Sequence, residues 1–340
     1  MITTKDIAEL AGVSPTTVSL VLNNKKHRIS QETCDRILRI AQDLGYTPNQ
    51  IAVSLATRKT NTIGLILPDI TNMFLSTITH SVERTAYNHH YGVFLCDADN
   101  DVDKTLYYID VLQKRCVDGI IIIPPATINE GDYPKRCSDI LNRCQIPYVL
   151  LEYAIHDIFH DFITLDNEMG GYMATKHLRD MGHTRIGCIT GPMSEYGARR
   201  RLNGYKQVLE ESRIAYNPDY VKYGTFQYDS GYQLAQELLA TDITAMFVSN
   251  DMMAIGAYNA LERKGVRIPE DISIVGFDNI PLLETMNIPL TTVNQPHAAM
   301  GKKAFEVLLG RIDDPDKPHR DYYFTPSLVE RTSVLNLDPQ

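Results

Sequence analysis

Several common sequence patterns are absent from this chain, and each absence argues against a class of protein. No apolar run approaches the roughly 20 residues that a membrane-spanning helix needs. The first residues, MITTKDIAEL, lack the basic-then-apolar order of a signal peptide. The six cysteines include no CxxC pair and show no metal-type spacing with the histidines. We therefore expect a cytoplasmic protein with reduced thiols, no bound metal and no membrane contact.

Motifs of catalysis and of cofactor binding are also missing. The sequence has neither GxGxxG after its first strand-like run nor GxxxxGK[ST], the glycine-rich loops that hold dinucleotides and nucleotide phosphates. It also lacks GxSxG, which presents a nucleophilic serine, and HExxH, which binds zinc. These absences argue against an enzyme and against a cofactor.

The charge of the chain is acidic overall but unevenly distributed. The formal net charge is −9, which is unexpected for a protein that binds nucleic acid. Residues 1–60 nevertheless contain eight Lys and Arg against five Asp and Glu, a net charge of +3 that leaves −12 for the rest. This division predicts that any phosphate contacts are confined to the N-terminal segment.

The N-terminal segment shows the pattern of three short helices. The first ends at Gly12, and Ser14 followed by Pro15 is typical of the start of a second helix, with a serine cap and proline at the first helical position. Ser30 is placed to cap a third helix that ends at Gly45. The apolar residues expected to face inward are Ile7, Leu10, Ala11, Val18, Val21, Leu22, Ile37, Ile40, Ala41 and Leu44. A helix, a turn with glycine and a second helix form the helix-turn-helix arrangement, although three small helices can also be a purely structural cap.

The outer face of the second helix argues for contact with DNA. Winding the helix at 100° per residue places Thr16, Ser19 and Asn23 opposite its apolar side. Solvated helix faces are usually rich in Glu and Lys, whereas short polar side chains suit a helix pressed against base edges and phosphates. Leu20 is the exception on this face. On the residues alone, Leu20 is most simply an incidental exposed aliphatic side chain, which is normal on any protein surface.

The rest of the chain shows the pattern of two α/β lobes. From residue 62, short β-rich runs such as TIGLILPD and ISIVGFDN alternate with amphipathic segments, which is typical of parallel βαβ units. There are too many such runs for one sheet, so we expect two doubly wound lobes. A polar residue ends many of the runs: Asp69, Asp97, Glu152, Asp166, Asn250 and Asp278. Open parallel sheets bind ligands beyond these ends, so the pattern predicts a polar cleft.

The segment EYGARRRLNGY at 195–205 is unusual because three arginines open a helix against the helix dipole, which favours acids there. They could form a solvated basic patch. Alternatively, one of them points into the cleft, where a guanidinium binds hydroxyl or carboxylate oxygens with two parallel hydrogen bonds.

The segments TTKDIAELAGVSPTTVSLVLNN and LGYTPNQIAVSLATRKTNTIGLILPD together resemble the lactose-repressor/galactose-repressor (LacI/GalR) family of bacterial transcription regulators. The resemblance covers the N-terminal segment and essentially the whole body. It implies DNA contacts by Thr3, Ser14, Pro15, Thr16, Thr17, Ser19, Leu20, Asn23, Ser30, Asn49, Ala52 and Leu55. It also implies that residues 49–57 form a hinge helix that orders on DNA, with Leu55 wedged into the minor groove. Family members often carry Arg or His where this chain has Leu20. With the helix placed in the major groove as the resemblance implies, Leu20 cannot donate to a guanine but can pack on a thymine methyl, so we expect an A·T preference there.

The same resemblance implies an effector pocket in the cleft. The motifs RLNGY, GFDN, SNDMMAIG and TTVNQP match effector-binding segments of the family. The implied effector contacts are Asn72, Phe74, Glu152, Arg199, Arg201, Phe226, Asn250, Asp278 and Gln295. An arginine, an aspartate, amides and an aromatic ring suit a sugar, which offers oriented hydroxyls and one apolar face. A purine, which also stacks on Phe226, is the alternative.

We accordingly predict a helix-turn-helix domain over residues 1–46, a hinge helix and linker over 47–60, and a periplasmic-binding-protein-like core of two doubly wound α/β lobes over 61–340. Lobe 1 is expected at about 61–160 and 292–322, and lobe 2 at about 161–291 and 323–340. No heptad repeat follows the last strand, so we expect a homodimer. The predicted function is an effector-controlled repressor that binds a pseudo-palindromic double-stranded operator. A sugar receptor without a DNA role, or a regulator that uses a phosphorylated carrier protein as co-repressor, are the alternatives.

Overall fold

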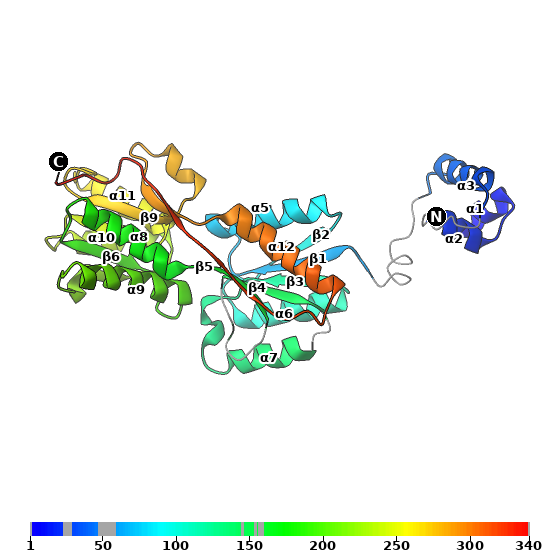
Figure 1. Cartoon of the computed structure of the whole chain (residues 1–340), viewed down its shortest axis with the longest axis horizontal. Coiled ribbons are helices and arrows are strands. Elements are labelled where there is room, and N and C mark those ends of the chain that lie inside the picture. Colours follow the sequence, from blue (N-terminus) through cyan, green and yellow to red (C-terminus); the bar gives the residue numbers. More distant parts are fainter. Residues whose placement is uncertain are drawn as a thin grey trace. The chain divides into compact units, whose positions relative to one another are not determined.

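A computed structural model describes residues 2–22, 29–46, 59–143, 146–152, 155 and 160–338 (Figure 1). The chain divides into two compact units, Met1–Thr60 and Asn61–Gln340. Among the helices that the structure describes, none combines the length and hydropathy needed to cross a membrane.

The described part of the first unit contains three helices, α1 (Thr4–Ala11), α2 (Pro15–Leu22) and α3 (Gln31–Asp43). Each begins at a side chain that accepts a hydrogen bond from the helix backbone, as the sequence predicts. Thr3 and Asp6 cap α1 reciprocally, the Ser14 hydroxyl accepts from the Thr17 N–H at 3.1 Å, and Ser30 accepts from Thr33. The turn between α1 and α2 passes through Gly12, whose left-handed backbone (φ +63°) closes the first helix.

The inner faces of these helices form a small core in which Ile7, Val18 and Ile37 are fully buried. Leu10 departs from its prediction, because 63% of its side chain is exposed. The buried stripe of α1 is centred on Ile7 and Ala11, and Leu10 lies about 100° away from Ala11 around the helix. The buried stripe of α1 is therefore narrower than the spacing of its apolar residues predicts.

Lobe 1 of the second unit is a parallel six-stranded sheet in the order β11-β5-β4-β3-β1-β2. Helices α5 and α12 pack side by side on one face, and α6 and α7 cover the other (Figure 1). The strands are β1 (Thr62–Leu67), β2 (Gly92–Asp97), β3 (Gly119–Ile122), β4 (Tyr148–Leu151), β5 (Asp161–Leu165) and β11 (Asp321–Phe324). The helices are α5 (Met73–Asn88), α6 (Val102–Lys114), η1 (Ala126–Asn129), α7 (Tyr133–Arg143) and α12 (His297–Asp313).

Lobe 2 repeats this architecture with the strand order β12-β10-β9-β8-β6-β7, in which β12 alone runs antiparallel to its neighbour. Helices α8 and α9 cover one face and α10 and α11 the other. The strands are β6 (Ile186–Thr190), β7 (Val221–Tyr223), β8 (Ala245–Val248), β9 (Ser273–Asp278), β10 (Thr291–Asn294) and β12 (Ser327–Val329). The helices are α8 (Asn167–Asp180), α9 (Tyr196–Glu211), η2 (Pro218–Tyr220), α10 (Tyr228–Leu238), α11 (Asp251–Arg263) and η3 (Pro281–Thr285).

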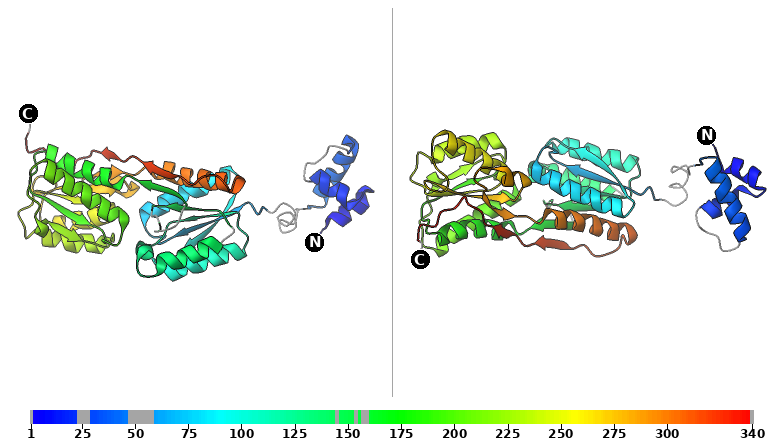
Figure 2. Two further views of the ribbon diagram at one scale, coloured as in Figure 1. Left: turned by 60° about the horizontal axis from the view of Figure 1, so that its bottom comes forward. Right: turned by 90° about the horizontal axis from the view of Figure 1, so that it is seen from above.

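The chain passes between the lobes three times, after Leu165, Asn294 and Phe324 (Figure 2). The predicted lobe boundaries at 160/161, 291/292 and 322/323 therefore need correction by two to five residues. Strand β5 pairs with β4 and β11 in lobe 1, and β10 pairs with β9 and β12 in lobe 2. Each passage begins where a strand has finished its hydrogen-bonded pairing, which places all three beside the carboxyl ends of strands.

Candidate functional site

The exposed face of α2 is the first candidate site. Thr16, Ser19 and Leu20 are exposed on it, while Val18 and Val21 point into the core of the first unit. The side chain of Leu20 is 38% exposed, which makes it available to a partner. The structure thus separates the two sides of the helix as the sequence predicts.

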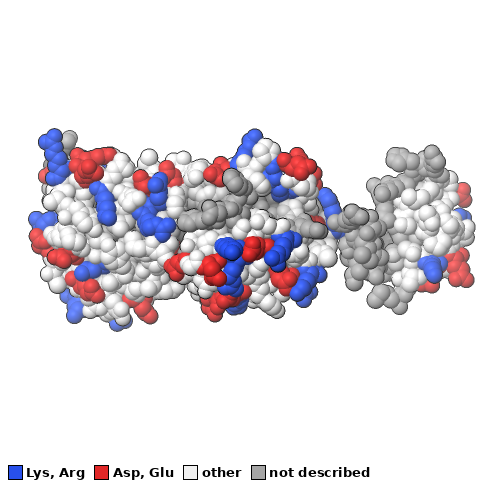
Figure 3. Space-filling model, turned by 90° about the horizontal axis from the view of Figure 1, so that it is seen from below, with Lys and Arg blue, Asp and Glu red and all other residues white. Residues whose placement is uncertain are grey.

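The other predicted DNA contacts lie around this helix or outside the described residues. Thr3, Ser14, Pro15 and Ser30 are exposed, and Thr17 is partly exposed. Asn23, Asn49, Ala52 and Leu55 lie outside the described residues, as does most of the predicted hinge, so their roles remain predictions. On the face of the second unit shown in Figure 3, the described Lys and Arg residues are interspersed with Asp and Glu and form no continuous basic stripe.

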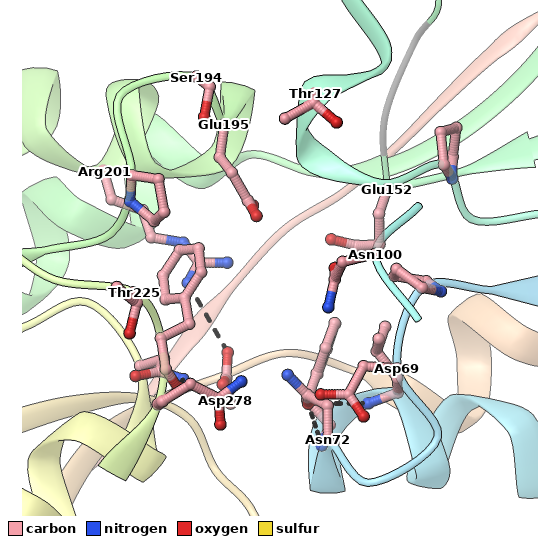
Figure 4. Close-up of a pocket in the computed structure, with 18 residues that line it drawn as sticks. Asp69, Asn72, Asn100, Thr127, Glu152, Ser194, Glu195, Arg201, Thr225 and Asp278 are labelled. Atoms are coloured by element: carbon pink, nitrogen blue, oxygen red, sulfur yellow. Dashed lines mark hydrogen bonds and ion pairs between the residues drawn. The ribbon is translucent and has the colours of Figure 1, made fainter. Parts of the chain in front are cut away.

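The second candidate site is a cavity of about 300 Å³ between the lobes, at the carboxyl ends of both sheets (Figure 4). Most of its lining residues are polar or charged, with Phe74, Leu75 and Phe226 supplying apolar surface. The full lining is Pro68, Asp69, Asn72, Phe74, Leu75, Asn100, Pro124, Thr127, Glu152, Pro192, Ser194, Glu195, Arg201, Thr225, Phe226, Gln227, Asn250 and Asp278.

Arg201 is the arginine of the triplet that faces the cavity. It is 6% exposed, and its Nε donates to Asn167 Oδ1 at 2.8 Å while Nη1 donates to the Ser249 carbonyl at 2.5 Å. Nη1 also lies 3.8 Å from Asp278 Oδ1. Because Nη2 makes no hydrogen bond with the described residues, it remains available to a ligand oxygen.

The close contact between α8 and α9 fixes the position of Arg201. A side-chain carbon added to Gly171 on α8 would lie 2.1 Å from the backbone oxygen of Arg201, closer than any real contact. Glycine is therefore required here if α9 is to bring Arg201 to the cavity. The other two arginines point elsewhere: Arg200 pairs with Glu168 at 3.0 Å, and Arg199 is exposed.

Phe226 has a strained backbone conformation, and its ring is held by close packing. Its φ of +65° lies in the left-handed region that a phenylalanine rarely adopts. A side-chain carbon on Gly191 would lie 2.2 Å from the ring, so the ring packs directly on the backbone of that residue. Glu152, Asp278 and Asn100 also have left-handed backbones. Such strain gathers at ligand sites because the surrounding structure must enforce it.

Asp278 is supported from behind by Gln295. The Nε2 of Gln295 donates to Asp278 Oδ1 at 2.7 Å, and Gln295 itself is fully buried. Burial raises the pKa of Asp278 above its ordinary value, which Arg201 and Gln295 oppose by stabilising the ionised form. Asp251 lies deeper, where burial and the nearby Asp278 also raise its pKa. Gln295 therefore orients Asp278 and does not line the cavity.

Glu152 is the most perturbed carboxyl that lines the cavity. It follows β4, is 6% exposed, and its Oε1 has no hydrogen-bond partner among the described residues. Burial raises the pKa of Glu152 to about 8, an effect that Arg201 opposes and that Asp278 and Glu195 reinforce. A buried carboxyl without a partner is costly, so this group is placed to meet a ligand.

Seven of the nine predicted effector contacts line the cavity, and two do not. The seven are Asn72, Phe74, Glu152, Arg201, Phe226, Asn250 and Asp278. Arg199 donates to the carbonyls of Met193 and Ser194 at 2.6 and 2.7 Å, so it supports the loop that carries Glu195 instead of facing the cavity. Gln295 lies behind Asp278, as described above.

Sequence reasoning missed several lining residues, among them Glu195, Asn100 and Thr127. They stand three or more residues beyond the strand ends. Glu195 and Asn100 lie in the loops that precede α9 and α6, and Thr127 lies in η1. Extending the search from the strand end to the whole following loop would have found them. Nowhere in the described part of the chain do three His, Cys, Asp or Glu side chains come close enough to hold a metal ion together.

Comparison with known proteins places both parts of the chain in known families. Residues 3–49 match the family described as "Bacterial regulatory proteins, lacI family", and residues 175–334 match a "Periplasmic binding protein-like domain". The HTH-type transcriptional repressor PurR of Vibrio cholerae serotype O1 is 37% identical over 340 residues, which cover 99% of each chain. The chain belongs to the LacI family.

Solved structures of LacI-family proteins match the fold. The lac repressor dimer bound to operator and the anti-inducer ONPF aligns with a TM-score of 0.87 at 28% identity, covering 98% of this chain and 99% of that one. A LacI-family transcriptional regulator from Enterococcus faecium with bound ribose aligns with a TM-score of 0.72 at 32% identity, covering 82% of this chain and all of that one. The present chain is thus a LacI-family transcriptional repressor in which a DNA-binding unit precedes an effector-binding core.

Proposed function

We propose that this LacI-family repressor binds a pseudo-palindromic operator as a homodimer through the exposed face of α2, and that a polyhydroxylated small molecule in the cavity controls this binding. The observation that carries the proposal is the convergence of Arg201, Asp278 and Phe226 on one cavity between the lobes.

Operator recognition is assigned to α2. In a helix-turn-helix protein the second helix enters the major groove, where its short polar side chains reach base edges and phosphates. Thr16 and Ser19 are exposed for that purpose, and Leu20 stands beside them. We further infer that Leu55 of each protomer wedges into the minor groove at the centre of the operator.

A sugar is the ligand class that best fits the cavity. The free Nη2 of Arg201 and the Asp278 carboxylate can meet neighbouring hydroxyls, while the ring of Phe226 offers a surface for the apolar face of a sugar ring. The bound ribose in the Enterococcus faecium regulator supports this class. A purine is the second candidate, because a flat base can also stack on Phe226.

Control of operator binding follows from the position of the ligand. A molecule that contacts both lobes stabilises one angle between them, and this angle biases the arrangement that the dimer presents to DNA. The coupling is reciprocal: the operator changes the affinity for the ligand by the same factor as the ligand changes the affinity for the operator.

The proposal is tested by mobility shift of the full chain on DNA from upstream of its own gene. Thr16→Glu adds a negative charge at the start of α2, where a helix tolerates an acid, and should abolish the shift by repelling phosphate. Asn203→Glu adds the same charge on the exposed side of α9 and should leave the shift unchanged. Equal binding by both variants would contradict the assignment of α2.

A further inference from the structure

The backbone of Glu152 is hydrogen-bonded on both sides, but its side chain is not. Its N–H donates to the Ile163 carbonyl at 2.8 Å, and its own carbonyl accepts from the Thr164 hydroxyl at 3.2 Å. Both partners lie on β5, the neighbour of β4 in the sheet. Figure 4 shows the carboxyl directed into the space between the lobes. The buried Oε1 at its end has no hydrogen-bond partner among the described residues.

No ion pair compensates this carboxyl. Arg201 is the one Lys or Arg among the described lining residues, and the ion pair that it forms is with Asp278, at 3.8 Å. Arg201 still favours the ionised form of Glu152, whereas Asp278 and Glu195 from lobe 2 disfavour it. Asp69, which lines the same cavity from lobe 1, is also an acid. An ionised Glu152 would therefore be a buried charge without a paired cation.

A proton resolves this conflict at a lower cost than burial of the charge. A carboxylate loses its hydration when it is buried, and protonation removes that penalty. Burial accordingly raises the pKa of Glu152 to about 8, so the group is largely protonated at neutral pH. A protonated carboxyl has an O–H donor, which a carboxylate lacks. With the residue only 6% exposed, this donor has little access to water and is placed for a ligand.

We propose that Glu152 recognises the effector as a neutral carboxylic acid, by donating its O–H to an oxygen of an uncharged sugar, and that effector binding is therefore linked to the protonation of Glu152. This inference rests on the proposed effector role of the cavity. It specifies the direction of one hydrogen bond to the ligand and makes pH a determinant of effector affinity.

A sugar supplies the acceptor that this donor requires. Its ring, glycosidic and hydroxyl oxygens all carry lone pairs, and none of them brings a charge into the cavity. Glu152 then donates from lobe 1 and the Nη2 of Arg201 donates from lobe 2, while Asp278 accepts from a neighbouring hydroxyl. A ligand that accepts hydrogen bonds from both lobes stabilises one arrangement of the lobes.

The sign of the linkage distinguishes this role from that of an ordinary carboxylate acceptor. If the sugar binds the protonated form, its affinity is constant below a pH of about 8 and falls about tenfold per pH unit above it. The fall ends at the pKa of the bound form, which the ligand raises further. If a sugar hydroxyl instead donated to ionised Glu152, the affinity would rise with pH over the same range.

Calorimetric titration of the full chain over a pH series measures this sign. The probes are D-ribose, D-glucose and D-galactose, because none of them ionises between about pH 7 and about pH 9.5. The affinity for a sugar that binds should fall at least about tenfold across that range. An affinity that is constant or rises with pH, or a failure of all three sugars to bind, overturns the inference.

Variants at Glu152 separate the donor from the charge. Glu152→Gln keeps a donor but cannot ionise, so its affinity should be constant over the pH series and should exceed that of the wild type at about pH 9.5. Glu152→Met keeps the length without a donor and should bind about tenfold more weakly than Glu152→Gln at every pH. Glu210→Gln, on the exposed side of α9, is the matched control and should follow the wild type. Equal affinities of the Gln and Met variants would contradict a donor at this position.

Infrared difference spectra of the wild type keep the test decisive if the variants fail to fold. The carbonyl stretch of a neutral carboxylic acid is separate from that of a carboxylate, and the signal of Glu152 should disappear with a midpoint near pH 8. Saturating sugar should restore this signal at about pH 9. A signal that the sugar leaves unchanged would overturn the inference.

Operator binding measured on the same samples separates this inference from the proposed function. A wild type that binds operator and a sugar, but with an affinity for the sugar that does not fall with pH, overturns the inference alone. A wild type that binds sugar with the expected pH dependence but binds no operator contradicts the proposed function and leaves the inference supported.

Discussion

Asn250 holds the backbone that presents Phe226 to the cavity. Its Nδ2 donates to the Phe226 carbonyl at 2.9 Å, and its Oδ1 accepts from the Met253 N–H at 3.0 Å. One side chain thus caps α11 and fixes a loop in left-handed backbone. The two halves of the amide perform separable tasks, and substitution can remove them one at a time.

Asn250→Asp should keep the cap and lose the donor to Phe226. We expect α11 to retain its stability, because aspartate is as good a cap as asparagine. The affinity for the ligand should fall about tenfold or more, since the ring is no longer held by its backbone. Asn250→Ala should lose both the cap and the donor to Phe226. The lost cap should lower the free energy of unfolding by about 1 kcal/mol. Calorimetry and urea unfolding of the two variants measure these effects, and identical stabilities would contradict the division of roles.

Leu20→Arg should change the operator sequence that the repressor selects. Arginine donates two hydrogen bonds to guanine, whereas leucine packs on a thymine methyl. We expect one position in each half-site to change from A·T to G·C, with discrimination of about 1–3 kcal/mol. Sequencing of DNA selected from a random pool by the wild-type chain and by the variant provides the measurement. An unchanged preference would show that Leu20 is an incidental exposed side chain.

Glu152 should make the stability of the protein depend on pH. Its pKa rises from 4.5 to about 8 on folding because the carboxyl is buried. A group that binds its proton more tightly in the folded state stabilises the fold at low pH and loses that contribution as the pH rises through its folded pKa. As the pH rises from about 5 to about 8.5, this group should therefore lower the free energy of unfolding.

Glu152→Gln has no titratable group at this position. Relative to the wild type, its free energy of unfolding should rise across that pH range, by up to a few kcal/mol at the upper end. Thermal unfolding of both proteins over the pH series gives the difference. Glu210→Gln should follow the wild type at every pH. Parallel curves for wild type and Glu152→Gln would refute the assignment of a raised pKa to Glu152.

Arg311 and Asp161 form a buried pair that joins α12 to β5 in lobe 1. Arg311 Nη2 lies 2.7 Å from Asp161 Oδ2, and the Arg320 N–H donates to the other carboxylate oxygen at 3.0 Å. Arg311→Met leaves the buried carboxylate uncompensated and should cost about 3–5 kcal/mol of stability. Adding Asp161→Asn to that variant should restore part of the loss. A double variant as unstable as the sum of the single variants would show that the two side chains are not coupled.

The sequence predicted most of the cavity because parallel sheets place their carboxyl ends together. Glu152, Asn250 and Asp278 were recognisable as polar residues that end apolar runs, without knowledge of which strands are neighbours. The choice of Arg201 among three consecutive arginines was different. Periodicity left it open, and family resemblance implied both Arg199 and Arg201. The contact of α9 with Gly171 explains physically why Arg201 is the one that faces the cavity.

Other features depend on distances that a sequence pattern does not contain. Gln295 matches an effector-binding motif, yet it lies one layer behind the cavity because Asp278 stands between them. Arg199 stands two residues before Arg201, about 200° away around α9, and bonds to its own loop. Leu10 has apolar spacing but lies off the centre of a narrow stripe. In each case the sequence indicates what kind of site or core the residue belongs to, but packing decides whether its side chain reaches that site or core.

The three passages between the lobes restrict how the second unit can move. Strands β5 and β11 are neighbours at one edge of the first sheet, and β10 and β12 are neighbours at one edge of the second. All three crossing segments therefore join the same edge of one sheet to the same edge of the other. The line along these two edges is the axis about which the lobes can rotate relative to each other. Strands β1 and β2 lie at the far edge of their sheet. In a rotation about that line, displacement grows with distance from it, so a closure of the lobes would move β1 farther than the strands beside the line. The first residue of β1 follows the DNA-binding unit in the chain.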